Sequence, residues 1–289
     1  MCIRDRPDTA EALLADLWLP PDGVPNSGLA IIWLHGGAWY SGNKGEIGLG
    51  MIRHLVRQGH VVLDLAYTLA PLTDLQGQIN DVKWAITWMR QNAASYNIDP
   101  AKIGLIGFSS GAHLALMTAY QPTTPGNGRS GDTSVAGVAA FFPPVDLADL
   151  LQYHGVTEEW RAQPDPDNPT LERLVRRLQR IPAEQPYYPP RRFLKHWLGE
   201  LSDEEASPIH HIGPHCPPTL LMHGEYDQVV PPTGSRRLQA ALNAAGVRSL
   251  LVEYPMVGHA FDVPAWSPAG QAALHDVERF FAILAGDPS

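Results

Sequence analysis

A serine between two glycines is the strongest chemical signal in this sequence. Residues 107–111 read Gly-Phe-Ser-Ser-Gly, the pattern G-x-S-x-G, and they lie between the apolar run 103–107 and a helical pattern. The glycines allow a sharp turn from strand to helix, which lifts a hydroxyl above the sheet at a helix N-terminus. The register predicts that Ser109 is a nucleophile and that Ser110 offers its backbone N–H. An ordinary tight turn is the alternative interpretation.

A second glycine pair can supply hydrogen-bond donors to the same reaction. Residues 35–39 read His-Gly-Gly-Ala-Trp and end the apolar run 29–34. Because two glycines let the backbone approach a ligand closely, N–H groups here can face an oxyanion that develops on a substrate carbonyl. A plain loop is the alternative, but the two segments together favour nucleophilic catalysis.

Strand and helix patterns alternate along the chain and would position these loops. Short apolar runs bounded by Gly and Pro predict strands over 12–19, 29–34, 61–65, 103–107, 135–142, 219–222 and 250–254. Apolar residues three and four apart predict helices around 52–56 and over 79–93, 112–119, 238–245 and 271–284. Such alternation is typical of βαβ units, so the predicted fold class is α/β, with a mostly parallel central sheet flanked by helices.

Composition excludes several other classes of protein. The 289 residues carry a net charge of −9 without a basic block, which argues against a nucleic-acid partner. No run of about 18 apolar residues predicts a membrane span, and two cysteines cannot build a disulfide scaffold. Residues 7–289 are therefore expected to form one soluble domain, as a monomer or a homodimer. Residues 1–6 resemble adapter sequence and are set apart from the fold, so cytoplasmic and secreted locations both stay open.

The stretch 150–206 interrupts the alternation of strands and helices. It contains no convincing strand, and Asn168 before Pro169 resembles the start of a helix. One face of that helix would be apolar, with Leu171, Leu174, Val175 and Leu178. We interpret 150–206 as a helical cap or lid inserted between two strands, near the edge where α/β sheets bind ligands. A packing decoration is the alternative.

Six segments in order resemble the α/β-hydrolase esterases, and most closely the hormone-sensitive-lipase-like and feruloyl-esterase-like carboxylesterases. The resemblance extends over residues 10–285 and implies an α/β-hydrolase fold that hydrolyses carboxylic esters through an acyl-enzyme. One departure is that Ala66 and Thr68 stand where relatives often carry Asp and Arg, which removes an ion pair. The segments that carry the resemblance are 35–39, 67–71, 107–115, 207–209, 223–231 and 258–261.

The resemblance also implies the role of each site residue. Ser109 would be the nucleophile, Asp227 the acid and His259 the general base, which is the chain order expected of this fold. Asp227 follows the predicted strand 219–222, where a carboxylate can accept the imidazole N–H. Glu225 and Asp262 are the rival acids. The oxyanion donors implied are the backbone N–H groups of Gly37, Ala38 and Ser110.

The substrate side of the site is predicted from residues next to the two catalytic segments and from the insertion. Trp39 and Phe108 flank the two catalytic segments and are assigned to substrate binding, together with Tyr187 and Tyr188 from the insertion. The insertion would bring either Tyr187 and Tyr188 or Trp197 within reach of the alcohol side. A packed cover limits the depth of a pocket, so short acyl chains are the expected substrates.

No metal or cofactor is expected. His210, His211, His215 and Cys216 have spacings that zinc could use, but the prolines around them predict a loop that leads into a strand. Two alternative functions stay open: an amide-directed relative of the arylformamidase or acyl-aminoacyl peptidase type, and a catalytically silent binding protein on the same fold.

Overall fold

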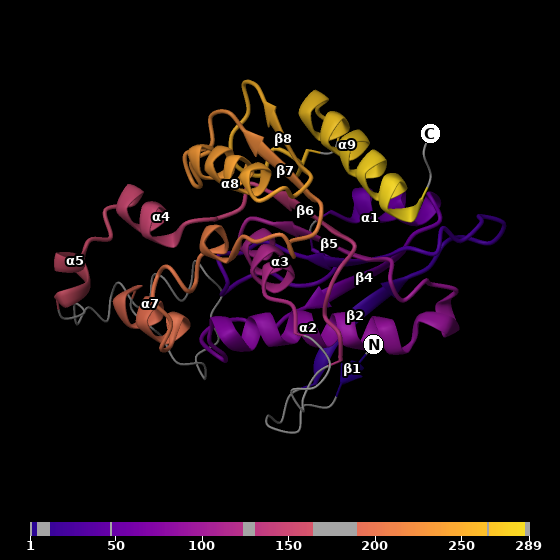
Figure 1. The fold of residues 1–289 in the computed structure, drawn as a ribbon, viewed down its shortest axis with the longest axis horizontal. Helices are drawn as coiled ribbons and strands as arrows, with labels where there is room; N and C mark the ends of the chain where they lie inside the picture. The colour runs from indigo at the N-terminus through magenta and orange to yellow at the C-terminus, as the bar shows by residue number, and fades with distance from the viewer. Residues whose placement is uncertain are drawn as a thin grey trace.

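An eight-stranded sheet organises the part of the chain that the computed structural model describes, which comprises residues 2–4, 12–46, 48–123, 131–163, 190–264 and 266–286. The strand order is β1-β2-β4-β3-β5-β6-β7-β8 (Figure 1). The strands from β4 to β8 in this order pair in parallel, whereas β1 and β2 are antiparallel to their neighbours. The bounds are β1 Cys2–Arg4, β2 Leu13–Trp18, β3 Ala30–Leu34, β4 Val61–Ala66, β5 Ile103–Phe108, β6 Gly137–Phe141, β7 Thr219–Gly224 and β8 Ser249–Tyr254. The mostly parallel sheet predicted from the sequence is confirmed.

Helices cover both faces of the sheet, which explains why central strands such as β3 and β5 are buried along their whole length. Core side chains of α2, α3 and α8 form one apolar layer, and those of α1 and α9 form the other. Figure 1 shows α2 and α3 on one side of the sheet and α9 with α1 on the other. The bounds are α1 Leu49–Arg57, α2 Leu75–Gln91, α3 Ser110–Tyr120, α8 Thr233–Ala244 and α9 Pro268–Ala285. None of these or the other described helices is long and apolar enough to cross a membrane.

Two helices begin earlier than the apolar pattern predicts. The helix expected from residue 79 starts at Leu75, because the Asp74 carboxylate accepts a hydrogen bond from the N–H of Gly77 (2.8 Å) and caps it. The helix expected from residue 238 starts at Thr233, after Pro232. Its first turn is polar, so apolar spacing alone could not reveal it.

The N-terminal residues correct one expectation. Residues 1–6 were set apart from the fold, yet Cys2–Arg4 pair with β2 as strand β1. Without this pairing β2 would be an edge strand with unpaired backbone groups, which are a template for a further strand. For these three residues the exclusion from the fold was wrong.

Helices also occupy the connection between β6 and β7. The described ones are α4 Leu147–Tyr153, α5 Glu158–Ala162 and α7 Pro190–Leu198, and a short 3-10 turn, Pro208–His211, follows them. In Figure 1 α4, α5 and α7 lie together at one end of the sheet. Residues 164–189, which include the predicted helix start at Asn168, the apolar stripe over 171–178 and both predicted tyrosine contacts, lie outside the described residues.

Candidate active site

The Ser109 turn is a strained connection between β5 and α3. Ser109 has φ 52° and ψ −117°, a conformation that non-glycine residues rarely adopt. Its flanking glycines are required by close packing: a Cβ on Gly107 would collide with the carbonyl of Gly111, and one on Gly111 would collide with the carbonyls of Leu34 and His35. The sequence therefore forms a turn that presents the Ser109 hydroxyl at the carboxyl edge of the sheet.

A hydrogen-bond chain joins this hydroxyl to an imidazole and a carboxylate. The Ser109 Oγ lies 3.1 Å from Nε2 of His259, and Nδ1 of His259 lies 2.7 Å from Oδ2 of Asp227. With Nδ1–H donating to the carboxylate, Nε2 is the acceptor that faces the serine. The arrangement can take a proton from Ser109.

Asp227 is held as a buried anion. Burial by itself would raise the pKa of this carboxyl, but hydrogen bonds from His223, from His259 and from the Val230 N–H outweigh it and hold the pKa well below its usual range. Oδ1 accepts from the N–H groups of Val229 (2.8 Å) and Val230 (2.9 Å). The acid next to His259 therefore stays ionised.

Parallel strand ends bring these residues together. Ser109 follows β5, Asp227 follows β7 and His259 follows β8, so all three emerge at one edge of the sheet. The loops after β7 and β8 contact each other directly. The Tyr226 N–H donates to the Val257 carbonyl (2.9 Å), and the backbone of Gly224 packs so closely on Gly258 that a Cβ at residue 224 would lie 2.5 Å from the Gly258 carbonyl oxygen.

The loop after β3, residues 35–41, faces the Ser109 turn with an unusual backbone. Gly37, Ala38 and Trp39 have φ values of 133°, 50° and 68°. The Gly37 carbonyl accepts hydrogen bonds from Tyr40 N–H, Ser41 N–H and the Ser41 hydroxyl, which closes the turn. Within the described residues, the N–H groups of Gly37, Ala38 and Ser110 donate to no protein acceptor. They are available to a ligand oxygen.

A cavity of about 480 Å³, here called the Ser109 cavity, opens over this site. His35, Gly37 and Ala38 of the β3 loop line it together with Ser109 and His259. Its remaining lining includes residues that motif analysis did not single out for the substrate site: Trp33, Phe142, Val229 and Val263. The Phe142 ring, whose centroid is 4.5 Å from that of His259, could have been found only from the fold, because Phe142 follows β6 in no recognisable motif.

Comparison with known proteins places the chain in a family. The family model of BD-FAE matches residues 15–188 and 189–242, well over half of the chain. The chain belongs to the BD-FAE family. This confirms the resemblance to feruloyl-esterase-like and hormone-sensitive-lipase-like proteins. The BD-FAE match includes Ser109 and Asp227 but ends before His259, so the position of His259 rests on the hydrogen bonds described above.

Individual relatives of this BD-FAE chain are esterases by name. It is similar to Esterase LipQ of Mycobacterium tuberculosis, with 31% identity over 278 residues that cover 94% of this chain and 60% of LipQ. The same organism's probable carboxylic ester hydrolase LipM is 28% identical, over 92% of this chain and 57% of LipM. The chain thus spans about three fifths of these relatives.

The fold itself matches a solved esterase from Thermogutta terrifontis. That structure, Est2 with propionate bound, superposes with a TM-score of 0.74 at 24% identity, over 99% of this chain and 94% of the other. The likeness confirms the α/β-hydrolase fold for this BD-FAE chain.

Aromatic residues predicted to bind substrate occupy different positions. Phe108 lines the Ser109 cavity and stacks on Phe141, with ring centroids 4.5 Å apart. Trp39 does not line that cavity; its ring packs on Trp197 at 4.3 Å. Trp197, the alternative to the two tyrosines, is only 1% exposed in the core and does not line the Ser109 cavity.

The two rival acids do not contact the imidazole. Glu225 is exposed on its loop, and no hydrogen bond joins it to His259 in the described structure. Asp262 lines the Ser109 cavity, where burial raises its pKa to about 6. Its Oδ1 is buried without a hydrogen-bond partner among the described residues.

The histidines around Cys216 make other contacts. His211 Nε2 lies 2.8 Å from the Glu205 carbonyl and His215 Nε2 lies 2.8 Å from the Tyr120 carbonyl. Among the described residues, no group of three His, Cys, Asp or Glu side chains is arranged to hold a metal ion.

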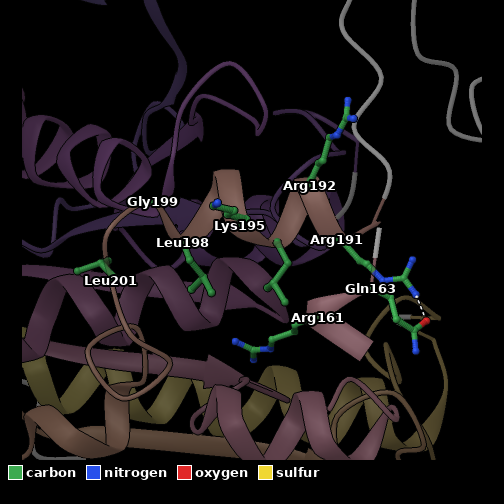
Figure 2. Close-up of a pocket in the computed structure, with 9 residues that line it drawn as sticks. Arg161, Gln163, Arg191, Arg192, Lys195, Leu198, Gly199 and Leu201 are labelled. Atoms are coloured by element: carbon green, nitrogen blue, oxygen red, sulfur yellow. Dashed lines mark hydrogen bonds between the residues drawn. The ribbon is translucent and has the colours of Figure 1, made fainter. Parts of the chain in front are cut away.

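A second cavity, of about 580 Å³, lies between α5 and α7 and shares no lining residue with the Ser109 cavity (Figure 2). Arg161 donates two hydrogen bonds to Asp203, at 3.1 and 2.6 Å. Arg191 lies over the Trp160 ring at 4.4 Å and donates to Gln163 (3.1 Å). Through these contacts the two arginines connect α5 to α7 and to the loop that contains Asp203. The lining comprises Arg161, Gln163, Arg191, Arg192, Leu194, Lys195, Leu198, Gly199 and Leu201.

Proposed function

We propose that this BD-FAE member is a serine carboxylic-ester hydrolase that works through an acyl-enzyme. One observation carries the proposal: Ser109 and His259 of the hydrogen-bond chain Ser109–His259–Asp227 line the same cavity as Gly37 and Ala38, whose backbone N–H groups have no protein acceptor among the described residues. A nucleophile with its base and a set of oxyanion donors are the parts that acyl transfer needs. The names of LipQ and LipM support the same reaction class.

In the first step Ser109 forms the ester bond to the enzyme. Its Oγ attacks the substrate carbonyl carbon while Nε2 of His259 takes the hydroxyl proton. The negative charge that develops on the carbonyl oxygen is stabilised by the N–H groups of Gly37, Ala38 and Ser110. The imidazolium then gives its proton to the leaving alkoxide, so an alcohol departs and the acyl group stays on Ser109.

In the second step a water molecule reverses the roles. His259 takes a proton from water, the resulting hydroxide attacks the acyl carbon, and the Ser109 Oγ leaves with the proton from the imidazolium. Asp227 stays ionised throughout and holds the Nδ1–H tautomer. The products are a carboxylic acid and regenerated enzyme.

We propose esters of short carboxylic acids as substrates. The Ser109 cavity, at about 480 Å³, lies toward the lower end of the roughly 300–1,000 Å³ typical of small-molecule sites. Its walls include the rings of Phe108 and Phe142, which suit a small apolar acyl group. The solved Thermogutta terrifontis esterase of the same fold holds propionate, which is an acid of this size.

A paired substitution at adjacent serines tests the mechanism. Ser109→Ala removes the nucleophile, so kcat for p-nitrophenyl acetate should fall by about 10⁴ or more. Ser110→Ala keeps the backbone N–H and should stay within about threefold of wild type. Mass spectrometry after fluorophosphonate treatment should place the label on Ser109. An inactive Ser110→Ala with an active Ser109→Ala would refute the assignment.

The alternatives are separated by substrate. An initial burst of p-nitrophenol, followed by steady turnover, is expected of an acyl-enzyme and not of a silent binding protein. Faster turnover of N-formylkynurenine or of a peptide anilide than of simple esters would favour the amide-directed alternative. Wild-type protein that processes none of these would refute the proposed function.

A further inference from the structure

The β3 loop needs an external restraint to keep its backbone conformation. Ala38 and Trp39 have φ values of 50° and 68°, in the left-handed region that non-glycine residues avoid. Such conformations persist only where surrounding contacts hold them. The N–H groups that face the Ser109 cavity belong to this strained segment, so whatever holds Trp39 also sets their direction.

The restraint on the backbone of Trp39 comes from a buried glutamine on α2. Nε2 of Gln78 donates to the carbonyls of Trp39 (2.8 Å) and Thr68 (2.9 Å). Its Oε1 accepts from the indole N–H of Trp197 (3.0 Å). Thr68 is fixed in turn, because its N–H and hydroxyl both donate to Asp81 (2.8 and 2.6 Å). Gln78 is fully buried and uses both ends of its amide, so its orientation is determined.

The side chain of Trp39 is held from two further elements. Its ring packs on Trp197 of α7, with centroids 4.3 Å apart. Its indole N–H donates to Nδ1 of His113 (3.2 Å), and Nε2–H of His113 donates to the Ala206 carbonyl (2.8 Å). Because His113 lies one turn beyond Ser109 on α3, this contact joins the oxyanion loop to the helix of the nucleophile.

We propose that Gln78 is a positioning residue that directs the N–H groups of Gly37 and Ala38, and that α7 anchors it through Trp197. This inference rests on the proposed function, since it assigns those N–H groups to the oxyanion. It gives α7 a part in turnover without contact to substrate. The Ala70 N–H also donates to the Trp39 carbonyl (2.9 Å), so loss of Gln78 should loosen the loop rather than release it.

Gln78→Met tests the proposal, because Met has a similar length and makes no strong hydrogen bond. We expect kcat for p-nitrophenyl acetate to fall 10- to 100-fold while KM changes less than threefold, since the donors act mainly on the transition state. The rate of fluorophosphonate labelling should fall in parallel. Gln76→Met, at an exposed position of the same helix, is the matched control and should behave as wild type.

Two further variants keep the test decisive if Gln78→Met folds poorly. Trp197→Phe keeps a ring against Trp39 but removes the N–H that anchors the glutamine, so it should lower kcat by a smaller factor with KM unchanged. Gln78→Glu keeps an acceptor for the Trp197 N–H but replaces the Nε2 donor with an oxygen that faces the carbonyls of Trp39 and Thr68. Its kcat should therefore stay as low as that of Gln78→Met. A Gln78→Glu enzyme with wild-type kcat would overturn the proposal.

A readout that needs no activity separates this proposal from the proposed function. In protein labelled with ¹⁵N-glycine, the amide resonance of Gly37 should shift in Gln78→Met and not in Gln76→Met. An unmoved Gly37 resonance, or normal kcat in a folded Gln78→Met enzyme, would overturn the positioning role. A wild-type protein inactive toward all esters, with the Gly37 resonance still displaced by Gln78→Met, would refute the proposed function alone.

Discussion

At the scale of single residues, Asp227 is the carboxylate that is hydrogen-bonded to His259, whereas Glu225 on the same loop is exposed. The Asp227 side chain has no solvent exposure, and its two oxygens accept from the His259 ring and from two backbone N–H groups. His223, buried beside it, fixes the loop: its Nε2 lies 2.8 Å from the Val230 carbonyl and its Nδ1 lies 2.8 Å from the Ser235 hydroxyl. The carboxylate is therefore held from both sides.

We expect Asp227→Asn to lower kcat for short esters by about 10² to 10⁴, because an amide no longer selects the Nδ1–H tautomer. Glu225→Gln should change kcat less than twofold, since Glu225 is exposed and does not contact His259. Steady-state kinetics of both variants check this. A larger loss in Glu225→Gln than in Asp227→Asn would contradict the assignment of the acid.

Site residues that belong to a local sequence motif could be predicted from the sequence, whereas site residues placed by tertiary packing could not. Ser109 and the glycines beside it are required by the turn, so their spacing reveals them. Phe142 and Gln78 have no local signature; each acquires its place because distant strands and helices meet there. The packing of Trp39 on Trp197 of α7 has no local signature either, because only the fold brings the two rings together.

At the scale of elements, the β3 loop depends on glycine at one position more than at its neighbours. Gly37 has φ 133°, and a Cβ there would collide with the carbonyl of Ser41. That carbonyl belongs to the turn that Gly37 itself closes. A side chain at residue 37 would therefore displace the backbone N–H groups of this loop, which we propose as oxyanion donors.

Gly37→Ala should lower kcat by about 10²-fold or more, which is the loss expected when an oxyanion donor is removed. Gly23→Ala is the control, because Gly23 also has positive φ (84°) but open space around its Cβ position. It should cost about 1 kcal/mol of stability and leave kcat unchanged. Kinetics together with urea unfolding separate the two effects, and equal kcat in both variants would contradict the argument.

Most of the fold was predictable because the sheet is buried on both faces. Continuous apolar runs between Gly and Pro predicted the strands from β2 to β8, and apolar spacing predicted α1, α2, α3, α8 and α9. A polar first turn concealed the true start of α8, whereas α2 begins one turn before Ile79, at Leu75, directly after its capping residue Asp74. Strand β1 has no pattern of its own and exists through its pairing with β2.

At the scale of the whole molecule, buried titratable groups make stability depend on pH with opposing signs. Burial lowers the pKa of His60 and His113 from 6.5 to about 4. The unfolded chain binds these protons first, so this stabilisation is complete above pH 6.5 and is lost as the pH falls toward 4. Burial raises the pKa of Asp64 and Asp262 to about 6, so their contribution is present below pH 3.8 and is lost as the pH rises through 6.

One variant isolates a single one of these contributions. When the pH falls from 7 to 4.5, the free energy of unfolding should decrease for wild type by about 2–3 kcal/mol more than for His60→Gln. The reason is that the pKa of His60 lies at about 4 in the folded protein and at 6.5 in the unfolded chain, and only wild type carries this difference. His275→Gln, at an exposed position, should follow wild type. Urea unfolding at both pH values checks this. Parallel loss in wild type and His60→Gln would contradict it.

The connection between β6 and β7 yields a prediction on chain length. None of the described residues of 150–206 lines the Ser109 cavity, so the experiment that tests the cap predicted from the sequence replaces the rest of this stretch, 164–189. Wild type should prefer acetyl to hexanoyl esters and show no activation by emulsions. Replacing 164–189 with a short Gly-Ser loop should raise KM and broaden the preference without abolishing acetyl-ester turnover.

A panel of p-nitrophenyl esters with two to sixteen carbons measures this preference before and after the replacement. The swap leaves α7 and Trp197 in place, so the oxyanion loop keeps its anchor. A wild-type optimum at sixteen carbons, or an identical profile after the swap, would refute the cover.

The hydrogen bond between Ser109 and His259 joins residues 150 positions apart, and this separation affects when the contact forms during folding. Closing so long a loop costs entropy before the contact stabilises anything, so such contacts form late in folding. His259 follows β8, which pairs only with β7 at the margin of the described sheet. Trp33 on β3 can be buried while β8 is still free, whereas Ser109 meets His259 only when β8 joins the sheet. We therefore expect a refolding chain to regain its tryptophan fluorescence before the reactivity of Ser109 toward fluorophosphonates.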